Sequence, residues 1–387
     1  MLAVHTFMMI ATAVMVLLFG LALLSLKYVF EGKIHRMVFR AALVFDGLVA
    51  AAMLTRPAFL RDALWAGSLL RIMFAICVAQ VIFMVLVYLA VFFRWVRRKM
   101  SASVPFSPSR RRLLKRAVLY PATAVAASGY GITYGIQKTV EREYEIPVKD
   151  LPEVLQGFRI AQLSDIHLGA FFSLERLKDL LEQAARGKPD ALVITGDIFD
   201  DVSLNPGAVE ILDSFSDAFP KGIWYCNGNH EHFRGIARIQ EMLSKTRIHA
   251  LVNEAEPAVE GERPLVFLGV DYPMHREDAA FQADRKAFLE KSMETVPEGA
   301  VKVLLAHHPE FIDDAAERGV ELTLTGHTHG SQFGFLGIPL FPVFKYTRGM
   351  IRKGMSYEYV HCGNGSWFPC RIGCPPEIAY FTLQREA

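Results

Sequence analysis

The chain has 387 residues, of which 52% are hydrophobic and 21% are charged. Ordinary globular domains carry about 45 to 50% apolar and about 25% charged residues, so this composition argues against a purely water-soluble protein. The near balance of 42 basic and 40 acidic residues excludes a disordered chain or one that binds nucleic acid over its whole length, and we expect no nucleic-acid partner.

The charge is divided unevenly along the chain. Residues 1–140 hold 17 Lys or Arg and 3 Asp or Glu, a net charge of +14, which leaves 25 basic and 37 acidic residues and a net charge of −12 for residues 141–387. Two segments so different in charge indicate two kinds of domain. We therefore predict a membrane region over 1–140 and a water-soluble domain over 141–387.

The first region contains about four candidate transmembrane helices. Three charge-free segments are each about 20 residues long, the length that spans a lipid core. They are Thr6–Leu26, Ile72–Phe93 and Ala117–Gln137. A fourth, Met37–Thr55, is apolar apart from Arg40 and Asp46. Charges in lipid are costly unless they face other helices, so we expect Asp46 to pair between helices, the alternative being a functional intramembrane acid.

The basic stretch 94–116 predicts the topology. It holds nine Lys or Arg and no acid, and short loops of that kind stay in the cytoplasm. Four spans then place both ends outside, which predicts a multi-pass protein of the inner cell membrane whose second half is extracytoplasmic. Residues 109–115 resemble a twin-arginine signal, which makes the twin-arginine export machinery a candidate partner, although an ordinary basic anchor is the alternative. If Ala117–Gln137 lay on the membrane surface, the second half would stay in the cytoplasm.

The second half shows the rhythm of an α/β domain. Apolar runs at Phe158–Ser164 and Ala191–Thr195 predict buried strands, and apolar residues at helical spacing from Leu174 to Ala184 predict a helix between them. Further strands are predicted at Ile223–Cys226, Leu265–Val270, Val301–Ala306 and Glu321–Thr325. The pattern predicts layered sheets covered by helices.

Polar side chains follow five of the predicted strands. They are Asp165 and His167; Asp197 and Asp200; Asn229, His230 and Glu231; His307; and His327 and His329. A single motif of this kind is commonly a surface turn or a packed core histidine. Five of them at strand ends favour a site for divalent transition metals, because oxygen and imidazole donors suit those ions and open α/β sheets bind ligands at this edge.

The ordered motifs D-x-H, G-D-x-x-D, G-N-H-E, H and G-H-x-H resemble the calcineurin-like metallophosphoesterases over roughly 146–383. Segments 146–158 and 373–378 are similar to the bacterial membrane-attached branch of that family, which also resembles enzymes that act on UDP-2,3-diacylglucosamine. The resemblance implies a four-layer α/β sandwich, preceded here by an all-α transmembrane region. It also implies two divalent metal ions, for which the donors suit Mn, Fe or Zn.

The resemblance further assigns roles by motif position. The first ion would be bound by Asp165, His167 and His329, and the second by Asn229, His307 and His327. Asp197 would bridge both ions, between which a hydroxide would attack phosphorus in line. His230 would stabilise the transition state or protonate the leaving oxygen.

Residues beside these motifs leave alternatives open. Asp200 could orient a ligating histidine or be a solvated loop acid, and we favour the former. Glu231 and His232 could contact substrate or orient His230, whereas His308 is expected to be only a neighbour. Ser331 stands where the family often has glycine.

Two features of the last segment are unusual. Cys362, Cys370 and Cys374 cluster in a Gly- and Pro-rich stretch, where an extracytoplasmic location would permit a Cys362–Cys370 disulfide. An apolar run over 333–344 precedes several basic residues. It could be a lid that meets the membrane or an acyl chain, or it could pack as local core.

These patterns predict a membrane-anchored, dinuclear-metal hydrolase of phosphate ester or pyrophosphate bonds. Tethering at the bilayer favours a phosphorylated lipid-linked or envelope substrate. One alternative is a nucleotide phosphodiesterase. Another is a non-catalytic, metal-bound scaffold attached to a functional membrane module.

Overall fold

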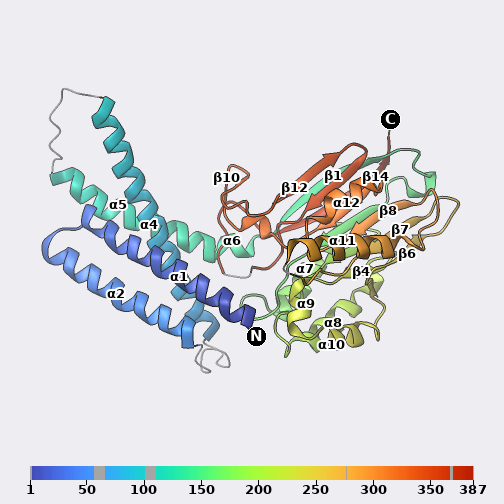
Figure 1. Ribbon diagram of the computed structural model, residues 1–387, viewed down its shortest axis with the longest axis horizontal. Coiled ribbons are helices and arrows are strands. Elements are labelled where there is room, and N and C mark those ends of the chain that lie inside the picture. Colours follow the sequence, from blue (N-terminus) through green and yellow to red (C-terminus); the bar gives the residue numbers. More distant parts are fainter. Residues whose placement is uncertain (1, 56–65, 101–109, 276, 367–368, 387) are drawn as a thin grey trace. The chain divides into compact units, whose positions relative to one another are not determined.

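A computed structural model describes residues 2–55, 66–100, 110–275, 277–366 and 369–386. The chain forms two compact units, Met1–Tyr134 and Gly135–Ala387. In Figure 1 the first unit is helical and coloured blue to green-blue, and the second contains the strands. Ser109 and the eight residues before it, part of the basic stretch, lie outside the described residues.

Long helices form the first unit. They are α1 (Leu2–Ser25), α2 (Gly32–Thr55), α4 (Ala66–Met100) and α5 (Arg110–Ile132). Leu23, Phe83 and Ala124, from α1, α4 and α5, are buried in one apolar cluster. The buried Asp46 of α2 accepts a hydrogen bond of 2.9 Å from Nε2 of Gln80 on α4, which is the pairing between helices expected for this acid.

The helical unit contains one clear candidate for a membrane span. Among the described residues, Leu69–Val96 within α4 is long and apolar enough to cross a membrane by length and composition. Thr12–Tyr28 is a shorter apolar helix. The predicted span Ala117–Gln137 is interrupted, because α5 ends at Ile132 and Tyr134–Gln137 forms the separate short helix α6. The other three predicted spans stay predictions.

The first sheet of the second unit has six strands. Its order is β1 (Val140–Val148), β14 (Glu377–Arg385), β2 (Arg159–Leu163), β3 (Ala191–Thr195), β4 (Ile223–Cys226) and β5 (His249–Ala250). Strands β2 to β5 are mutually parallel, and β14 runs antiparallel to β2. The carboxyl ends of β2, β3 and β4 therefore lie at one edge.

The second sheet also has six strands. Its order is β12 (Gly349–Lys353), β13 (Ser356–Val360), β9 (Leu322–Thr325), β8 (Val301–Leu305), β7 (Leu265–Gly269) and β6 (Glu254–Val259). The central strands are parallel, and β12 and β6 are antiparallel edges. A two-stranded hairpin, β10 (Gly334–Phe335) and β11 (Ile338–Pro339), stands apart from both sheets.

Alternating side chains stack the two sheets into a sandwich. On β3, Val193 faces the apolar core between the sheets, whereas its neighbours Leu192 and Ile194 face helices on the outside. The outer helices of the first sheet are α7 (Leu174–Arg186), α8 (Asn205–Ser214) and α10 (Ile236–Leu243). Those of the second sheet are α11 (Asp278–Met293) and α12 (Phe311–Glu317). This four-layer α/β arrangement confirms the predicted fold class.

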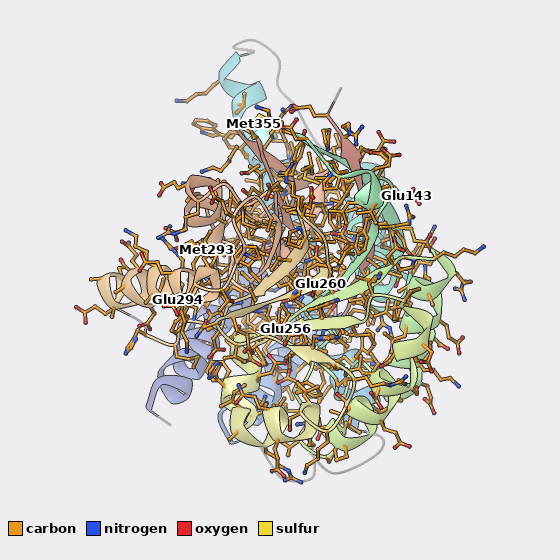
Figure 2. The ribbon with its side chains drawn as sticks, turned by 90° about the vertical axis from the view of Figure 1, so that its right-hand side faces the viewer. Glu143, Glu256, Glu260, Met293, Glu294 and Met355 are labelled. Atoms are coloured by element: carbon orange, nitrogen blue, oxygen red, sulfur yellow. The ribbon has the colours of Figure 1, made fainter. Side chains whose placement is uncertain are left out.

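Figure 2 labels residues at the borders of these layers. Glu143 lies on the edge strand β1 and Glu256 on the edge strand β6, while Met293 ends the outer helix α11. The Glu256 carboxylate lies 2.7 Å from Nδ1 of His249 on β5, so this pair joins the adjacent edges of the two sheets.

Candidate metal centre

The predicted ligand residues meet where strand ends of the two sheets face one another. They follow β2, β3 and β4 of the first sheet and β8 and β9 of the second. Three groups of acidic and imidazole atoms lie close enough to hold a metal ion: Asp165, His167 and His329; His167, Asp197 and His230; and Asp197, His307 and His327. The structure therefore brings all the acidic and histidine residues of the predicted site into one cluster.

The first group is almost fully buried. Nε2 of His167 lies 3.0 Å from Nε2 of His329, and the latter lies 3.4 Å from Oδ1 of Asp165. Asp165 also accepts a 3.0 Å hydrogen bond from the backbone N–H of His327. Two ring nitrogens and a carboxylate converge here in a buried position, which is a geometry suited to a cation.

Asp197 joins the first group to the second. Its Oδ2 lies 3.7 Å from Nε2 of His167 and 3.2 Å from Nε2 of His307. Nε2 of His307 lies 3.2 Å from Nδ1 of His327. One carboxylate oxygen is thus within reach of both histidine groups, as a bridging ligand requires.

A hydrogen bond to the backbone determines which ring nitrogen of His307 faces the metal centre. Nδ1 of His307 donates to the carbonyl oxygen of Thr195 at 2.7 Å, because a carbonyl can only accept. Nε2, which faces Asp197, is left as the nitrogen available to a metal.

Asn229 supplies an independent test of whether this site fits a metal. Its side-chain oxygen Oδ1 is buried and has no hydrogen-bond partner among the described residues. A buried amide oxygen without a partner costs free energy, and a cation would satisfy it. Together with imidazole and carboxylate donors, this oxygen fits a divalent metal ion.

The backbone of the site is held in an unusual conformation. Asp165, His167, Asp197, His327 and His329 have φ angles of 51°, 50°, 56°, 71° and 50°. Residues other than glycine seldom adopt these left-handed angles, which cost free energy and occur at functional sites. All five residues carry the polar side chains that converge in the cluster.

Glycines in the motifs permit close approach. A Cβ on Gly228 would lie 2.2 Å from Oδ1 of Asp197, and one on Gly326 would lie 2.0 Å from Oγ of Ser164. Any larger residue at these positions would displace the loops that carry Asp197 and Asp165. This explains why glycine precedes the polar residues in the G-N-H-E and G-H-x-H motifs.

Glu231 positions the loop of Asp197 by binding its backbone. Its fully buried carboxylate accepts hydrogen bonds of 2.8–3.2 Å from four backbone N–H groups. The donors are Asp197, Ile198, Phe199 and Gly228. The hypothesis that Glu231 contacts substrate or orients the His230 ring therefore gives way to a role in holding two loops together.

Asp200 orients two histidines. Its carboxylate lies 2.8 Å from Nδ1 of His230 and 3.2 Å from Nδ1 of His167, and it accepts a 2.8 Å hydrogen bond from Arg234. Burial would raise the pKa of Asp200, but the two histidines hold it below its ordinary value. Burial lowers the pKa of His230, but the bond to Asp200 outweighs it and raises that pKa. Asp200 is therefore no free loop acid.

The electrostatics of the centre favour positive charge. Burial raises the pKa of Asp197, but the charge and hydrogen bond of His307 outweigh it and hold that pKa well below its ordinary value. Burial lowers the pKa of His307, yet Asp197 raises it to about 10. A buried carboxylate that draws a positive charge to itself is also a strong place for a metal cation.

The neighbouring histidines have separate surroundings. Burial, with the charges of His307 and Arg285, lowers the pKa of His308 to about 3, so this ring is neutral. It packs against Phe281 and is a neighbour, as expected. Nε2 of His232 lies 2.9 Å from Oδ1 of Asp271, whereas the ring of His230 pairs with Asp200.

Sequence reasoning missed Arg371. This side chain is 1% exposed and its guanidinium lies 3.3 Å from Nδ1 of His329. It also donates 2.8 Å and 2.6 Å hydrogen bonds to the carbonyls of Cys362 and Gly365. An arginine in a Gly- and Pro-rich stretch carries no sequence signal of burial, so only the fold reveals that it positions His329.

The proposed Cys362–Cys370 disulfide is wrong in this structure. All five cysteines are free thiols. The sulfurs of Cys362 and Cys374 both lie against Gly330, and Sγ of Cys374 donates to the carbonyl of His329 at 3.4 Å. Arg371 anchors to the carbonyls of Cys362 and Cys374, which brings these two chain segments together and leaves Cys370 beside Gln332.

A family model described as calcineurin-like phosphoesterase matches residues 158–331. That segment contains each predicted ligand residue, from the strand before Asp165 to the turn after His329. The match therefore covers the whole of the candidate centre.

Three curated relatives extend this likeness. The chain is 29% identical over 293 residues to the uncharacterized metallophosphoesterase YkuE of Bacillus subtilis, which covers 71% of this chain and 98% of that protein. It is 26% identical over 284 residues to the phosphodiesterase YaeI of Escherichia coli, covering 71% and 99%. It is 30% identical over 280 residues to a transmembrane protein with metallophosphoesterase domain of Danio rerio, covering 68% of this chain and 61% of that one.

Replacing Glu231 by Gln tests its positioning role. The amide nitrogen cannot accept the backbone N–H groups that the carboxylate binds, so we expect a loss of roughly 2 to 4 kcal/mol in stability. Thermal unfolding monitored by circular dichroism measures it. Glu241→Gln, at an exposed glutamate that pairs with the exposed Lys245, should leave the unfolding temperature unchanged. Equal unfolding temperatures for both variants would contradict the role.

Proposed function

Because the chain belongs to the calcineurin-like phosphoesterase superfamily and is a metal-dependent phosphoesterase, we propose that it is a membrane-anchored enzyme with two divalent metal ions. It would hydrolyse phosphate ester or pyrophosphate bonds of a lipid-linked or envelope substrate. The observation that carries the proposal is the position of the Asp197 carboxylate within reach of both histidine groups.

The donors divide into two sets around Asp197. Asp165, His167 and His329 would hold one ion, and Asn229, His307 and His327 the other. When bound, such ions supply Lewis acidity toward phosphoryl oxygens and lower the pKa of water. The mixed imidazole, carboxylate and amide donors suit Mn, Fe or Zn.

His230 is the proposed proton donor to the leaving oxygen. Asp200 holds its Nδ1, which directs Nε2 toward the cluster, 3.9 Å from Oδ2 of Asp197. The His230 side chain is 24% exposed, more than the ligand candidates His167 and His307. A partly exposed ring beside the metal set is suited to meet a substrate oxygen.

Membrane anchoring supports the substrate class. The chain carries the apolar helix Leu69–Val96, and the relative from Danio rerio is named a transmembrane protein. The basic stretch 94–116 would remain in the cytoplasm, and with a multi-pass anchor the catalytic unit would then lie on the extracytoplasmic side. The twin-arginine export machinery is a proposed partner in this placement. An enzyme held there meets phosphorylated lipids and envelope polymers first.

Replacing Asp197 by Asn tests the two-metal centre. A neutral amide cannot offset the repulsion of two cations. We therefore expect Mn²⁺-dependent hydrolysis of a nitrophenyl phosphodiester to fall by about 100-fold or more, because replacing a residue that only orients a metal ligand already costs about 10- to 100-fold. Metal content per chain should fall as well, while the circular dichroism spectrum stays the same. Asp217→Asn, at an exposed acid, is the matched control. Retained activity in Asp197→Asn would overturn the site.

Replacing His230 by Ala tests proton donation. We expect hydrolysis of an alkyl phosphoester to fall by roughly 100- to 10,000-fold, because a poor leaving group needs a proton. Nitrophenolate leaves without one, so hydrolysis of the nitrophenyl ester should fall much less. The ratio of the two kcat/KM losses is the measurement, and equal losses on both substrates would assign His230 to another role.

Fusions after Leu383 test the topology. Alkaline phosphatase folds only outside the cytoplasm and a standard fluorescent protein is bright only inside it. We expect an active phosphatase fusion and a dark fluorescent fusion in bacterial cells. The reverse pair of results would place the catalytic unit in the cytoplasm.

A further inference from the structure

An apolar hairpin beside the metal centre carries exposed side chains at its tip. It comprises residues 333–344 and includes β10 and β11. Six of its large apolar side chains are exposed: Phe335 by 65%, Leu336 by 86%, Ile338 by 67%, Leu340 by 54%, Phe341 by 60% and Val343 by 82%. The sequence left open whether these residues form local core, and for these six they do not. Apolar clusters of this kind on a surface mark an interaction site.

The base of the apolar hairpin is held firmly, so the exposure of its tip is built into the fold. Backbone N–H of Gly334 donates to the carbonyl of Ile372 at 2.7 Å, and Leu340 N–H donates to the carbonyl of Phe333 at 3.0 Å. A Cβ on Gly373 would lie 2.0 Å from the Gly334 carbonyl. The base of the apolar hairpin is therefore closely packed against the 372–373 segment.

The apolar hairpin also contacts the metal centre directly. The ring of Phe344, at its end, has its centroid 5.1 Å from that of His327 and 5.7 Å from that of His308. The end of the apolar hairpin is thus in contact with the proposed metal ligand His327.

Positive charge follows the apolar residues. Residues 333–355 contain Lys345, Arg348, Arg352 and Lys353 and no acidic residue. Both lysines bind Asp313. Arg348 and Arg352 donate to backbone carbonyls and form no ion pair with a carboxylate within the described part of the chain. Two guanidinium groups that follow the exposed apolar side chains in the sequence complement an anionic lipid surface.

We propose that the apolar hairpin inserts into the lipid layer of a bilayer, with Arg348 and Arg352 at the level of its anionic headgroups. The same chain carries Leu69–Val96, a helix long and apolar enough to cross a membrane. A bilayer is therefore the partner that we propose for the apolar hairpin. Because Phe344 of the apolar hairpin contacts His327, insertion would bring the headgroup phosphate of a lipid to the metal centre. As a statement about substrate delivery, the inference rests on the proposed function.

A fluorescent label at the tip tests insertion. The full-length variant Leu336→Cys carries an environment-sensitive nitrobenzoxadiazole dye and is reconstituted in vesicles of phosphatidylcholine and phosphatidylglycerol that contain nitroxide-labelled lipid. The control is Val154→Cys, an exposed apolar position at 70% exposure away from the apolar hairpin. We expect blue-shifted emission and strong quenching at 336 but not at 154. Equal quenching at both positions, or cross-linking of 336 between two copies, would overturn the proposal.

Hydrolysis separates insertion from catalysis. In the double variant Leu336→Ser with Val343→Ser, hydrolysis of a lipid phosphoester in vesicles should fall about tenfold or more, given the apolar surface removed. Hydrolysis of a water-soluble nitrophenyl ester should stay within about twofold, as in the control Val154→Ser. Equal losses on both substrates would refute delivery by insertion. If the unaltered chain cleaves neither substrate while the dye at 336 is quenched, the proposed function fails and insertion stands.

Discussion

The metal centre depends on hydrogen bonds that join the ends of the two sheets. His307, after β8, donates to the carbonyl of Thr195 at the end of β3, and Asp165, after β2, accepts from the backbone N–H of His327 after β9. Gln162 donates from β2 to the carbonyl of Thr325 on β9 at 3.0 Å. These bonds cross the sandwich where its apolar core ends. They set the distance between the polar loops, and the packing of the apolar core sets the distance between the strands.

The site stores strain that surrounding contacts hold in place. Five of its residues have left-handed backbone angles, which are unfavourable outside glycine. The Glu231 carboxylate compensates at Asp197 by binding four backbone N–H groups, and Arg371 compensates near His329 through the carbonyls around it. The buried charged side chains of Glu231 and Arg371 therefore hold loops whose backbone conformation is unfavourable by itself. The residues that would bind a metal are thus different from Glu231 and Arg371, which position the loops that carry those ligands.

Local sequence predicted the central strands well and the long-range partners poorly. Ala191–Thr195 and Ile223–Cys226 are strands with the predicted bounds, because a short continuous apolar run buried on both faces has few alternatives. The pairing of β1 with β14 joins Val140 to Glu377 and carries no local signal. The thiol neighbour of Cys362 is Cys374 and not Cys370, since the buried Arg371 decides how that loop folds.

The sequence by itself determined the α/β class, the basic and acidic halves, and the set of residues that could bind metal, because hydrophobic period, charge and donor type are local properties. The tertiary structure alone decided that Asp197 reaches both histidine groups, that Asp200 orients His230 and His167, and that Glu231 holds loops. It also decided that the apolar run after His329 lies exposed at the surface. The reason is physical: each of these features is a distance between chain segments, and such distances are set only when the two sheets pack against each other.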